Sequence, residues 1–222
     1  MQIYLTDLKD KKLKSEHLKL LSPRAKNAFL RLCARNEKHA LQTAAADLLL
    51  KKAISPLILP ATKTQTASEV FAFNVIETDG GKPYIDGAPD FSISHSENLA
   101  AVAVADDNEG ELGLDVQLLT DSVSPALLKG VFSEYEADVF KKIETEPDKI
   151  KYFYKTFTEK ESYVKFTGEG FKTLPREINN FNGAKFLTKY VFNRNELYCL
   201  TVCAENISSL KINVCLFDDL LF

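Results

Sequence analysis

Residues 91–117 read FSISHSENLAAVAVADDNEGELGLDVQ, and this stretch decides the class of fold. Its alternating and continuous apolar runs predict three short strands, at Phe91–Ser96, Leu99–Ala105 and Leu112–Gln117. Asp106–Gly110 has the polar, glycine-containing composition of a turn, so the last two strands are expected to form a hairpin. Short antiparallel strands at the centre of the chain favour a fold of the α+β class.

Helical periodicity flanks these strands on both sides. Apolar residues recur at intervals of three and four from Pro23 to about Ile54, and Ser22 before Pro23 is typical of a helix start. A second long helix is predicted from about Asp148 to Phe166, with Gly168 at its end.

Shorter elements complete the predicted fold. Ser133 and Glu136 form a capping-box pattern, which predicts a helix to about Ile143. Further strands are expected at Gln2–Leu5, Val70–Ile76, Lys185–Phe192, Leu197–Ala204 and Lys211–Phe217. The sequence therefore predicts two similar α/β halves, residues 1–110 and 111–222, each with a long helix and antiparallel strands. We expect a protein duplicated in this way to be a monomer.

Composition and charge exclude several classes of protein. The 222 residues are 45% hydrophobic and 27% charged, as in globular proteins and unlike disordered tails. The net charge of −3 argues against nucleic-acid binding. Met1–Asp10 has charges where a signal peptide needs an apolar run, and no stretch reaches the ~20 apolar residues of a membrane span. The four cysteines form no CxxC pair, so we expect reduced thiols in a cytoplasmic protein without a membrane partner.

A carboxylate interrupts the apolar stripe of the second long helix. Phe153 and Phe157 lead at intervals of four to Glu161, and Val164 follows three residues later. A buried carboxylate needs a charged partner or a metal ion. Lys165 lies four residues after Glu161, so an ordinary intrahelical ion pair is the alternative to a functional site.

The strand Leu112–Gln117 carries a second polar pair. Asp115 and Gln117 lie on one face, beside Gly113, and the apolar residues lie on the other. Oxygen-bearing side chains at this spacing suit a hard cation such as Mg²⁺. A solvated polar face is the alternative explanation.

Three further stretches have the chemistry of a phosphate site. Ser94 and His95 offer a hydroxyl and an imidazole, and the GGKP turn at residues 80–83 offers glycines and Lys82. Basic residues on the first long helix are Arg24, Lys26, Arg31, Arg35 and Lys38. Taken alone, these stretches have structural explanations as well: a polar strand end, an ordinary turn and a solvated helix face.

Six motifs occur in a fixed order between Gly81 and Gly170: GKPYI, FSISHS, GLDVQ, FSEYE, FTEKESYVK and GEG. This order resembles that of the 4′-phosphopantetheinyl transferases, specifically the longer, carrier-protein-activating Sfp-type class. Weaker matches at Leu21–Pro23 and Thr43 extend the resemblance towards the N-terminus. The shorter, trimeric acyl-carrier-protein synthase class fits this length poorly.

The resemblance implies a duplicated fold with coenzyme A bound in the cleft between its halves. It implies a Mg²⁺-dependent enzyme of the holo-[acyl-carrier-protein] synthase type. Such an enzyme moves 4′-phosphopantetheine from coenzyme A to a serine of an apo acyl or peptidyl carrier protein and releases adenosine 3′,5′-bisphosphate.

The resemblance also assigns catalytic roles. Asp115 and Glu161 match the metal-binding carboxylates, and Glu161 also matches the general base. Lys165 and His95 match groups that stabilise the pyrophosphate. The family has a glutamate at the position of Gln117, where the neutral amide can still offer an oxygen but lowers the negative charge facing the metal.

Contacts to coenzyme A are implied for Lys26, Thr43, Gly81, Lys82, Pro83, Ser94, His95 and Lys165. For the 3′-phosphate, Lys26 is favoured over Arg24 and Arg31.

Two other functions are compatible with the same residues. Gln117 suggests a non-catalytic module that binds coenzyme A or a carrier protein. A Mg²⁺-dependent hydrolase of nucleotides would use a similar set of charged side chains. The sequence does not specify the carrier, so fatty-acid, polyketide and nonribosomal-peptide carriers are all candidates.

Overall fold

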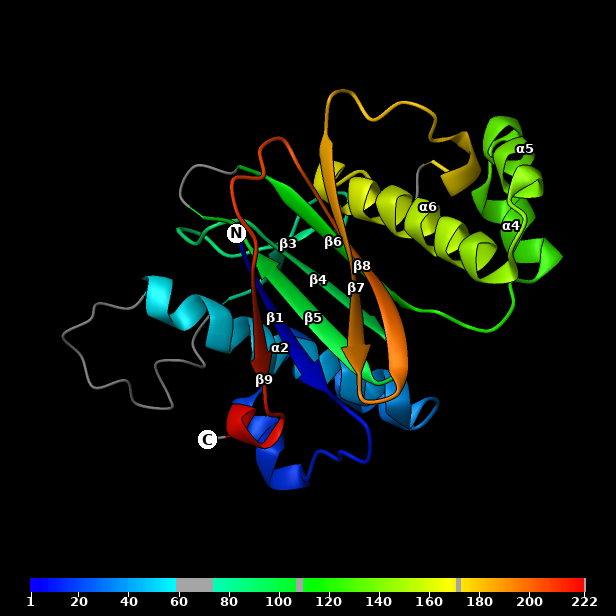
Figure 1. Ribbon diagram of the computed structural model, residues 1–222. Coiled ribbons are helices and arrows are strands. Elements are labelled where there is room, and N and C mark those ends of the chain that lie inside the picture. Colours follow the sequence, from blue (N-terminus) through cyan, green and yellow to red (C-terminus); the bar gives the residue numbers. More distant parts are fainter. Residues whose placement is uncertain (59–73, 107–109, 171–172, 222) are drawn as a thin grey trace.

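Two sheets form the centre of the computed structural model, which describes residues 1–58, 74–106, 110–170 and 173–221 (Figure 1). The first sheet, in the order β4-β5-β1-β9, contains Phe91–Ser96, Leu99–Val104, Gln2–Asp7 and Lys211–Cys215. The second, in the order β6-β8-β7, contains Leu112–Leu118, Glu196–Ala204 and Lys185–Asn193. A small ribbon pairs β2 (Ile76–Glu77) with β3 (Pro83–Tyr84).

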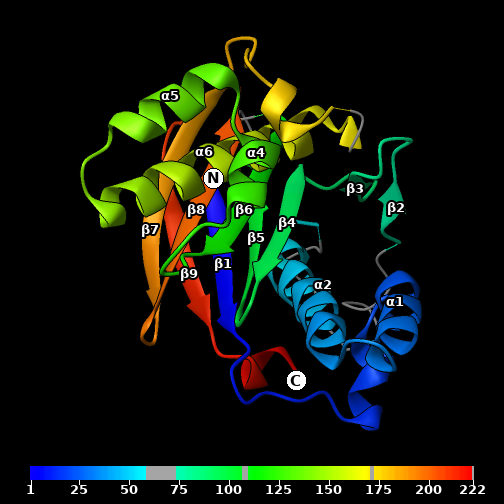
Figure 2. The same ribbon diagram turned by 90° about the vertical axis from the view of Figure 1, so that its right-hand side faces the viewer.

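The α-helices cover the outer faces of the two sheets. They are α1 (Pro23–Cys33), α2 (Glu37–Ile58), α4 (Pro125–Val131), α5 (Glu134–Lys142) and α6 (Glu146–Thr167). Short 3₁₀ turns lie at Ser15–Leu20, Pro175–Glu177 and Asp218–Leu220. Helix α2 packs on the first sheet and α6 on the second, so the layers run helix, sheet, sheet, helix (Figure 2). None of the described helices is long and apolar enough to cross a membrane.

The central strand β5 is apolar on both faces, because both faces are covered. Leu99, Ala101 and Ala103 pack against the second sheet, whereas Val102 and Val104 pack against α2. This placement contradicts the expected hairpin: β5 pairs with β4 and β1, while β6 pairs with β8 in the other sheet. A strand with two apolar faces belongs at the centre of a sheet between two layers, and local alternation could not reveal its partners.

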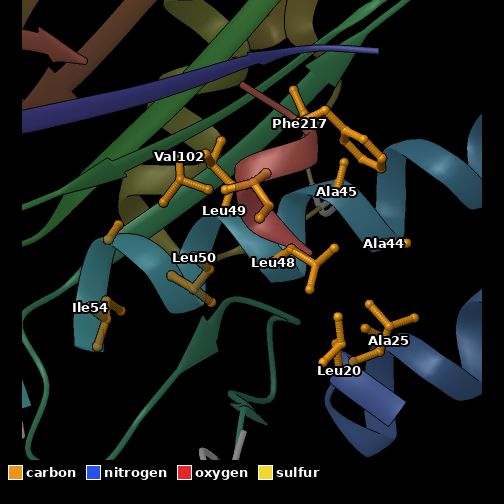
Figure 3. Close-up of a cluster of buried hydrophobic side chains, with 14 of the residues drawn as sticks. Leu20, Ala25, Ala44, Ala45, Leu48, Leu49, Leu50, Ile54, Val102 and Phe217 are labelled. Atoms are coloured by element: carbon orange, nitrogen blue, oxygen red, sulfur yellow. The ribbon is translucent and has the colours of Figure 1, made fainter. Parts of the chain in front are cut away.

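The core beneath α2 joins both ends of the chain to the first sheet (Figure 3). It consists of buried side chains from the first 3₁₀ turn, α1, α2, β5 and the C-terminal segment, among them Leu20, Ala25, Leu48, Leu49, Ile54, Val102 and Phe217. Alanines at several α2 positions allow the helix to approach α1 and the sheet closely. This packing fixes the helix that carries Thr43.

The predicted single helix from Pro23 to Ile54 is two helices. The chain leaves α1 after Cys33, and Asn36 begins α2 by accepting a hydrogen bond from the backbone N–H of His39 at 2.9 Å. An asparagine at an N-cap is a recognisable start signal that the unbroken apolar periodicity concealed. Parts of two other predictions, the strand Val70–Ile76 and the turn at Asp106–Gly110, lie outside the described residues.

The same order of elements recurs in the two parts of the chain. In each, a first strand is followed by a long helix and a hairpin, and the first strand pairs with the second hairpin strand. The fold is thus mixed α+β with antiparallel sheets, and the twofold relation between its halves stays a prediction. One strand crosses the predicted boundary at residue 110, because β9 pairs in parallel with β1.

Candidate active site

Asp115 and Glu161 come from two elements that approach each other closely. A Cβ built on Gly113 of β6 would lie 1.9 Å from the carbonyl oxygen of Ser162 and 2.5 Å from the backbone nitrogen of Phe166. Contacts this short require the helix backbone to move. The glycine therefore allows α6 to lie directly on β6, with the polar face of the strand turned towards the helix.

Lys165 forms an ion pair with Asp115, and the Ser94 hydroxyl hydrogen-bonds to both residues. The Lys165 ammonium donates to Asp115 Oδ1 at 2.8 Å and to Ser94 Oγ at 3.0 Å. Its third hydrogen bond goes to the carbonyl oxygen of Leu114 at 2.9 Å, so all three of its N–H donors are used. The alternative predicted from spacing, an ion pair between Lys165 and Glu161, is absent from the described residues.

The carboxylate of Asp115 is almost fully buried and well satisfied. Its Oδ1 also accepts from the Ser94 hydroxyl at 2.8 Å, and its Oδ2 accepts from the amide of Gln117 at 3.1 Å. The side chain is 3% exposed. Hydrogen bonds and an ion pair of this kind offset the cost of burying a carboxylate.

Glu161 is half-buried and makes no side-chain hydrogen bond or ion pair with the described residues. Burial raises the pKa of its carboxyl, the charge of Asp115 raises it further, and Lys165 acts in the opposite direction. A carboxylate in this environment is stabilised by a cation or a proton. It is the acidic group of the site that is free to react.

A cavity of about 350 Å³ has Glu161 in its wall. Its lining comes from α1, α2, β4, the 80–83 loop and α6, so it lies between the two parts of the chain. The predicted residues in this lining are Thr43, Gly81, Lys82, Pro83, His95, Glu161 and Lys165. Ser94, Asp115 and Gln117 do not line it. The volume is within the range of small-molecule sites.

Two separate motifs meet in one wall of the cavity. A Cβ on Gly80 would lie 1.6 Å from the carbonyl oxygen of Gly168, so the GGKP loop packs against the end of α6. Lys82 then reaches back to Asp90, with 2.8 Å between its Nζ and Oδ2. The GEG motif therefore has a packing role that its spacing alone did not disclose.

The basic residues of α1 differ in whether they line the cavity. Lys26, favoured for the 3′-phosphate, is exposed and does not line the cavity, and the same holds for Arg31. Arg24, the other alternative, does line it and donates from Nε to Glu77 Oε1 at 2.8 Å. Tertiary packing decides which face of a helix lines a cavity. The apolar periodicity of α1 therefore could not predict which of its basic residues would do so.

Ser94 and His95 point to opposite faces of β4, as neighbours in a strand do. Ser94 joins Asp115, whereas the His95 ring faces the cavity and packs edge-on against His39 of α2, with 5.1 Å between ring centroids. Burial lowers the pKa of His95 to about 4, helped by His39 and Lys165. His39 was not singled out from the sequence, although it lies one helical turn before Thr43.

This pKa predicts a specific loss of stability in mild acid. The folded His95 stays neutral down to about pH 4, while in the unfolded chain it takes up a proton near pH 6.5. Its contribution to stability is therefore complete above pH 6.5 and falls as the pH drops towards 4. Between pH 7 and 5.5, the wild type should lose about 1 kcal/mol more than His95→Asn in urea unfolding. Equal losses in the two proteins would show that His95 titrates normally.

The donor set is compatible with a hard divalent cation. Glu161 supplies a carboxylate that has no partner in the described part of the chain, Asp115 supplies Oδ2, and Gln117 supplies an amide. Oxygen donors of this kind are those preferred by Mg²⁺. The set contains two carboxylates, and among the described residues no group of three or more His, Cys, Asp or Glu side chains is arranged to hold a metal.

The chain is similar to one known family and to two curated proteins. Residues 111–210, which include β6 and α6, match the 4′-phosphopantetheinyl transferase superfamily. A candidate 4′-phosphopantetheinyl transferase of Synechocystis sp. is 32% identical over 101 residues, covering 45% of this chain and 40% of that protein. The 4′-phosphopantetheinyl transferase gsp of Aneurinibacillus migulanus is 26% identical over 151 residues, covering 68% of this chain and 57% of that protein. The chain spans about half the length of these curated relatives.

Proposed function

Because residues 111–210 match the 4′-phosphopantetheinyl transferase superfamily, we propose that this chain transfers 4′-phosphopantetheine from coenzyme A to a serine of an apo carrier protein. The observation that carries this proposal is the Glu161 carboxylate, which has no partner among the described residues and lies in a cavity wall near the Asp115–Lys165 ion pair. A base, a fixed positive charge and a ligand-sized cavity are the parts that phosphoryl-group transfer needs.

The cavity lining supports a place for coenzyme A. Lys82 and Pro83 would lie beside the nucleotide, and Thr43 would contact it from α2. We assign the 3′-phosphate to Arg24 in place of Lys26, because Arg24 lines the cavity and Lys26 does not. A phosphate oxygen at this position would replace the exposed Glu77 carboxylate as the partner of the guanidinium.

Glu161, Asp115 and Gln117 are the residues that would hold Mg²⁺. When bound, the cation would offset the negative charge of the pyrophosphate. The chain itself contributes fixed groups: Lys165 forms an ion pair with Asp115, and His95 faces the cavity as a neutral hydrogen-bonding group.

Glu161 has the properties of the general base. In the transfer, the carrier serine oxygen forms a bond to the phosphorus next to pantetheine, and the bond from that phosphorus to the bridging oxygen breaks. Adenosine 3′,5′-bisphosphate leaves with the bridging oxygen, and the serine proton passes to Glu161 directly or through water. The raised pKa of the carboxyl makes it a better proton acceptor than an exposed glutamate.

Gln117→Glu is expected to keep activity and lower the Mg²⁺ concentration that gives half-maximal rate. A carboxylate at this position adds negative charge beside Asp115, whose Oδ2 is the present partner of the Gln117 amide. Titrating Mg²⁺ in the transfer assay measures this change. An unchanged Mg²⁺ requirement would mean that the side chain at 117 does not face the cation.

The proposed function is tested by measuring the mass of the carrier protein before and after the reaction. The protein is incubated with coenzyme A, Mg²⁺ and a panel of apo acyl and peptidyl carrier proteins, each paired with a variant whose acceptor serine is alanine. We expect at least one carrier to gain the mass of phosphopantetheine, and its alanine variant to gain none. If no carrier gains mass although coenzyme A binds, the non-catalytic module suggested by Gln117 is the correct reading.

A further inference from the structure

Along the edge of β6 that faces β4, the backbone N–H groups are hydrogen-bonded to side chains of residues 90–96. Four backbone N–H groups, at alternate residues, each donate to a side-chain oxygen of residues 90–96. The pairs are Leu112 with Asp90 Oδ2 at 2.7 Å, Leu114 with Ser92 Oγ at 2.9 Å, Val116 with Ser94 Oγ at 3.2 Å, and Leu118 with Ser96 Oγ at 3.0 Å. We call these four bonds the serine ladder.

The serine ladder joins the two sheets without a backbone ladder. Alternate N–H groups of a strand point to the same edge, and here each step of two residues along β4 meets a step of two along β6. The other edge of β6 pairs with β8 in the ordinary way. A slip by one residue would leave these N–H groups, two of them in fully buried bonds, without their acceptors, so the ladder fixes the register of β6 against β4.

The register matters because Asp115 lies between two rungs. The Leu114 and Val116 rungs hold the strand on either side of the aspartate, and the Leu118 rung follows Gln117 directly. Glu161 belongs to α6 and is placed by the contact of that helix with Gly113. The distance between the two carboxylates therefore depends on where the ladder holds β6.

We propose that Ser96 is a positioning residue for the transfer reaction, acting through the backbone of Leu118 on Gln117 and Asp115. This inference rests on the proposed function for its effect on turnover. Ser96 differs from Ser94, whose hydroxyl also contacts Asp115, and from Ser92, which lines the cavity. Ser96 touches neither the cavity nor the charged pair, so its effect on the reaction must pass through the strand.

The test compares Ser96→Ala, which removes the acceptor, with Ser96→Thr, which keeps a hydroxyl. We expect Ser96→Ala to lower kcat about tenfold, the equivalent of one hydrogen bond, with KM for coenzyme A unchanged and a higher Mg²⁺ requirement. Ser96→Thr should restore kcat and the Mg²⁺ requirement. The control is Ser55→Ala, which removes a buried hydroxyl whose one bond to a described residue stays within α2, to the carbonyl oxygen of Lys51.

A second measurement does not depend on activity. Backbone amide hydrogen exchange, resolved at Leu118 and Val116, should be faster in Ser96→Ala than in wild type, Ser96→Thr or Ser55→Ala. Unchanged exchange at Leu118 would overturn the ladder itself. Faster exchange with wild-type kcat and Mg²⁺ requirement would overturn the positioning role. If the wild type transfers nothing to any carrier, the proposed function fails, while the exchange result still decides whether the ladder holds β6.

Discussion

Glu161→Gln is expected to lower the single-turnover rate of transfer by roughly 10²-fold or more. The substitution keeps the size of the side chain and removes both its negative charge and its capacity to accept a proton at oxygen. Glu161 is the acidic residue of the cavity wall that has no partner among the described residues, so no neighbouring carboxylate is placed to replace it. Rapid-quench measurement of holo-carrier formation gives this rate directly.

The stability of the same variant separates a catalytic role from a structural one. Because burial and Asp115 raise the pKa of Glu161, its ionisation weakens the folded state, and this cost appears as the pH rises above the usual range for glutamate. Without metal, Glu161→Gln should therefore melt at the same or a higher temperature than wild type at pH 7.5, and the difference should shrink towards pH 4.5. A lower melting temperature with normal turnover would show that Glu161 serves the fold.

Gly113→Ala is expected to have the largest effect on stability. The added methyl group would meet backbone atoms of Ser162 and Phe166, which cannot rotate away as a side chain can. Overpacking of this kind costs about 3 kcal/mol, and for a chain of this size that corresponds to a melting temperature lower by roughly 6–12 °C. Displacement of α6 from β6 should also lower the transfer rate, because Glu161 and Asp115 lie on opposite sides of this contact.

Gly130→Ala provides a matched control for that experiment. Gly130 is in helix α4, and a Cβ built there meets nothing within 4 Å. Alanine favours a helix over glycine by up to about 1 kcal/mol, so this variant should be as stable as wild type or more stable. Differential scanning calorimetry of the two variants compares them directly. Equal, small effects would mean that α6 can move away from β6 at little cost.

Local signals in the sequence predicted much of the fold. The capping box at Ser133 and Glu136 and the left-handed Gly168 at the end of α6 are found as expected. The alternation in β6 correctly separated Leu114 and Val116 from Asp115. These features depend on neighbours within a few residues, which is the range over which sequence patterns act.

The pairing of the strands could not be predicted from such local signals. Both edges of β6 are satisfied, one by β8 and the other by serine side chains, and neither partner is its neighbour in sequence. The serines of the FSISHS motif, expected at a phosphate site, accept from backbone N–H groups of β6, whereas His95 of the same motif faces the cavity. A polar residue at every second position of a strand is compatible with solvent, a ligand or another strand, so the pattern alone does not choose.

The pairing of the charged residues in the site was also beyond what local sequence patterns predict. The spacing on α6 predicts that Lys165 pairs with Glu161. In the structure the Lys165 ammonium pairs with Asp115, about 50 residues away in the chain. Asp115 and Ser94 accept two of its three N–H donors. An intrahelical pair at exposed positions contributes little, whereas a buried aspartate requires a partner. Lys165 therefore pairs with Asp115, the more deeply buried carboxylate, and the Glu161 carboxylate is left for the reaction.

The most direct test of the central claim counts both products of one reaction. Coenzyme A, Mg²⁺ and an apo carrier that accepts the group are mixed with the protein, and adenosine 3′,5′-bisphosphate and modified carrier are quantified in the same sample. Transfer to the carrier serine predicts one bisphosphate released for each carrier modified, and no release without a carrier. Bisphosphate formed in the absence of a carrier would contradict the account and identify the protein as a hydrolase.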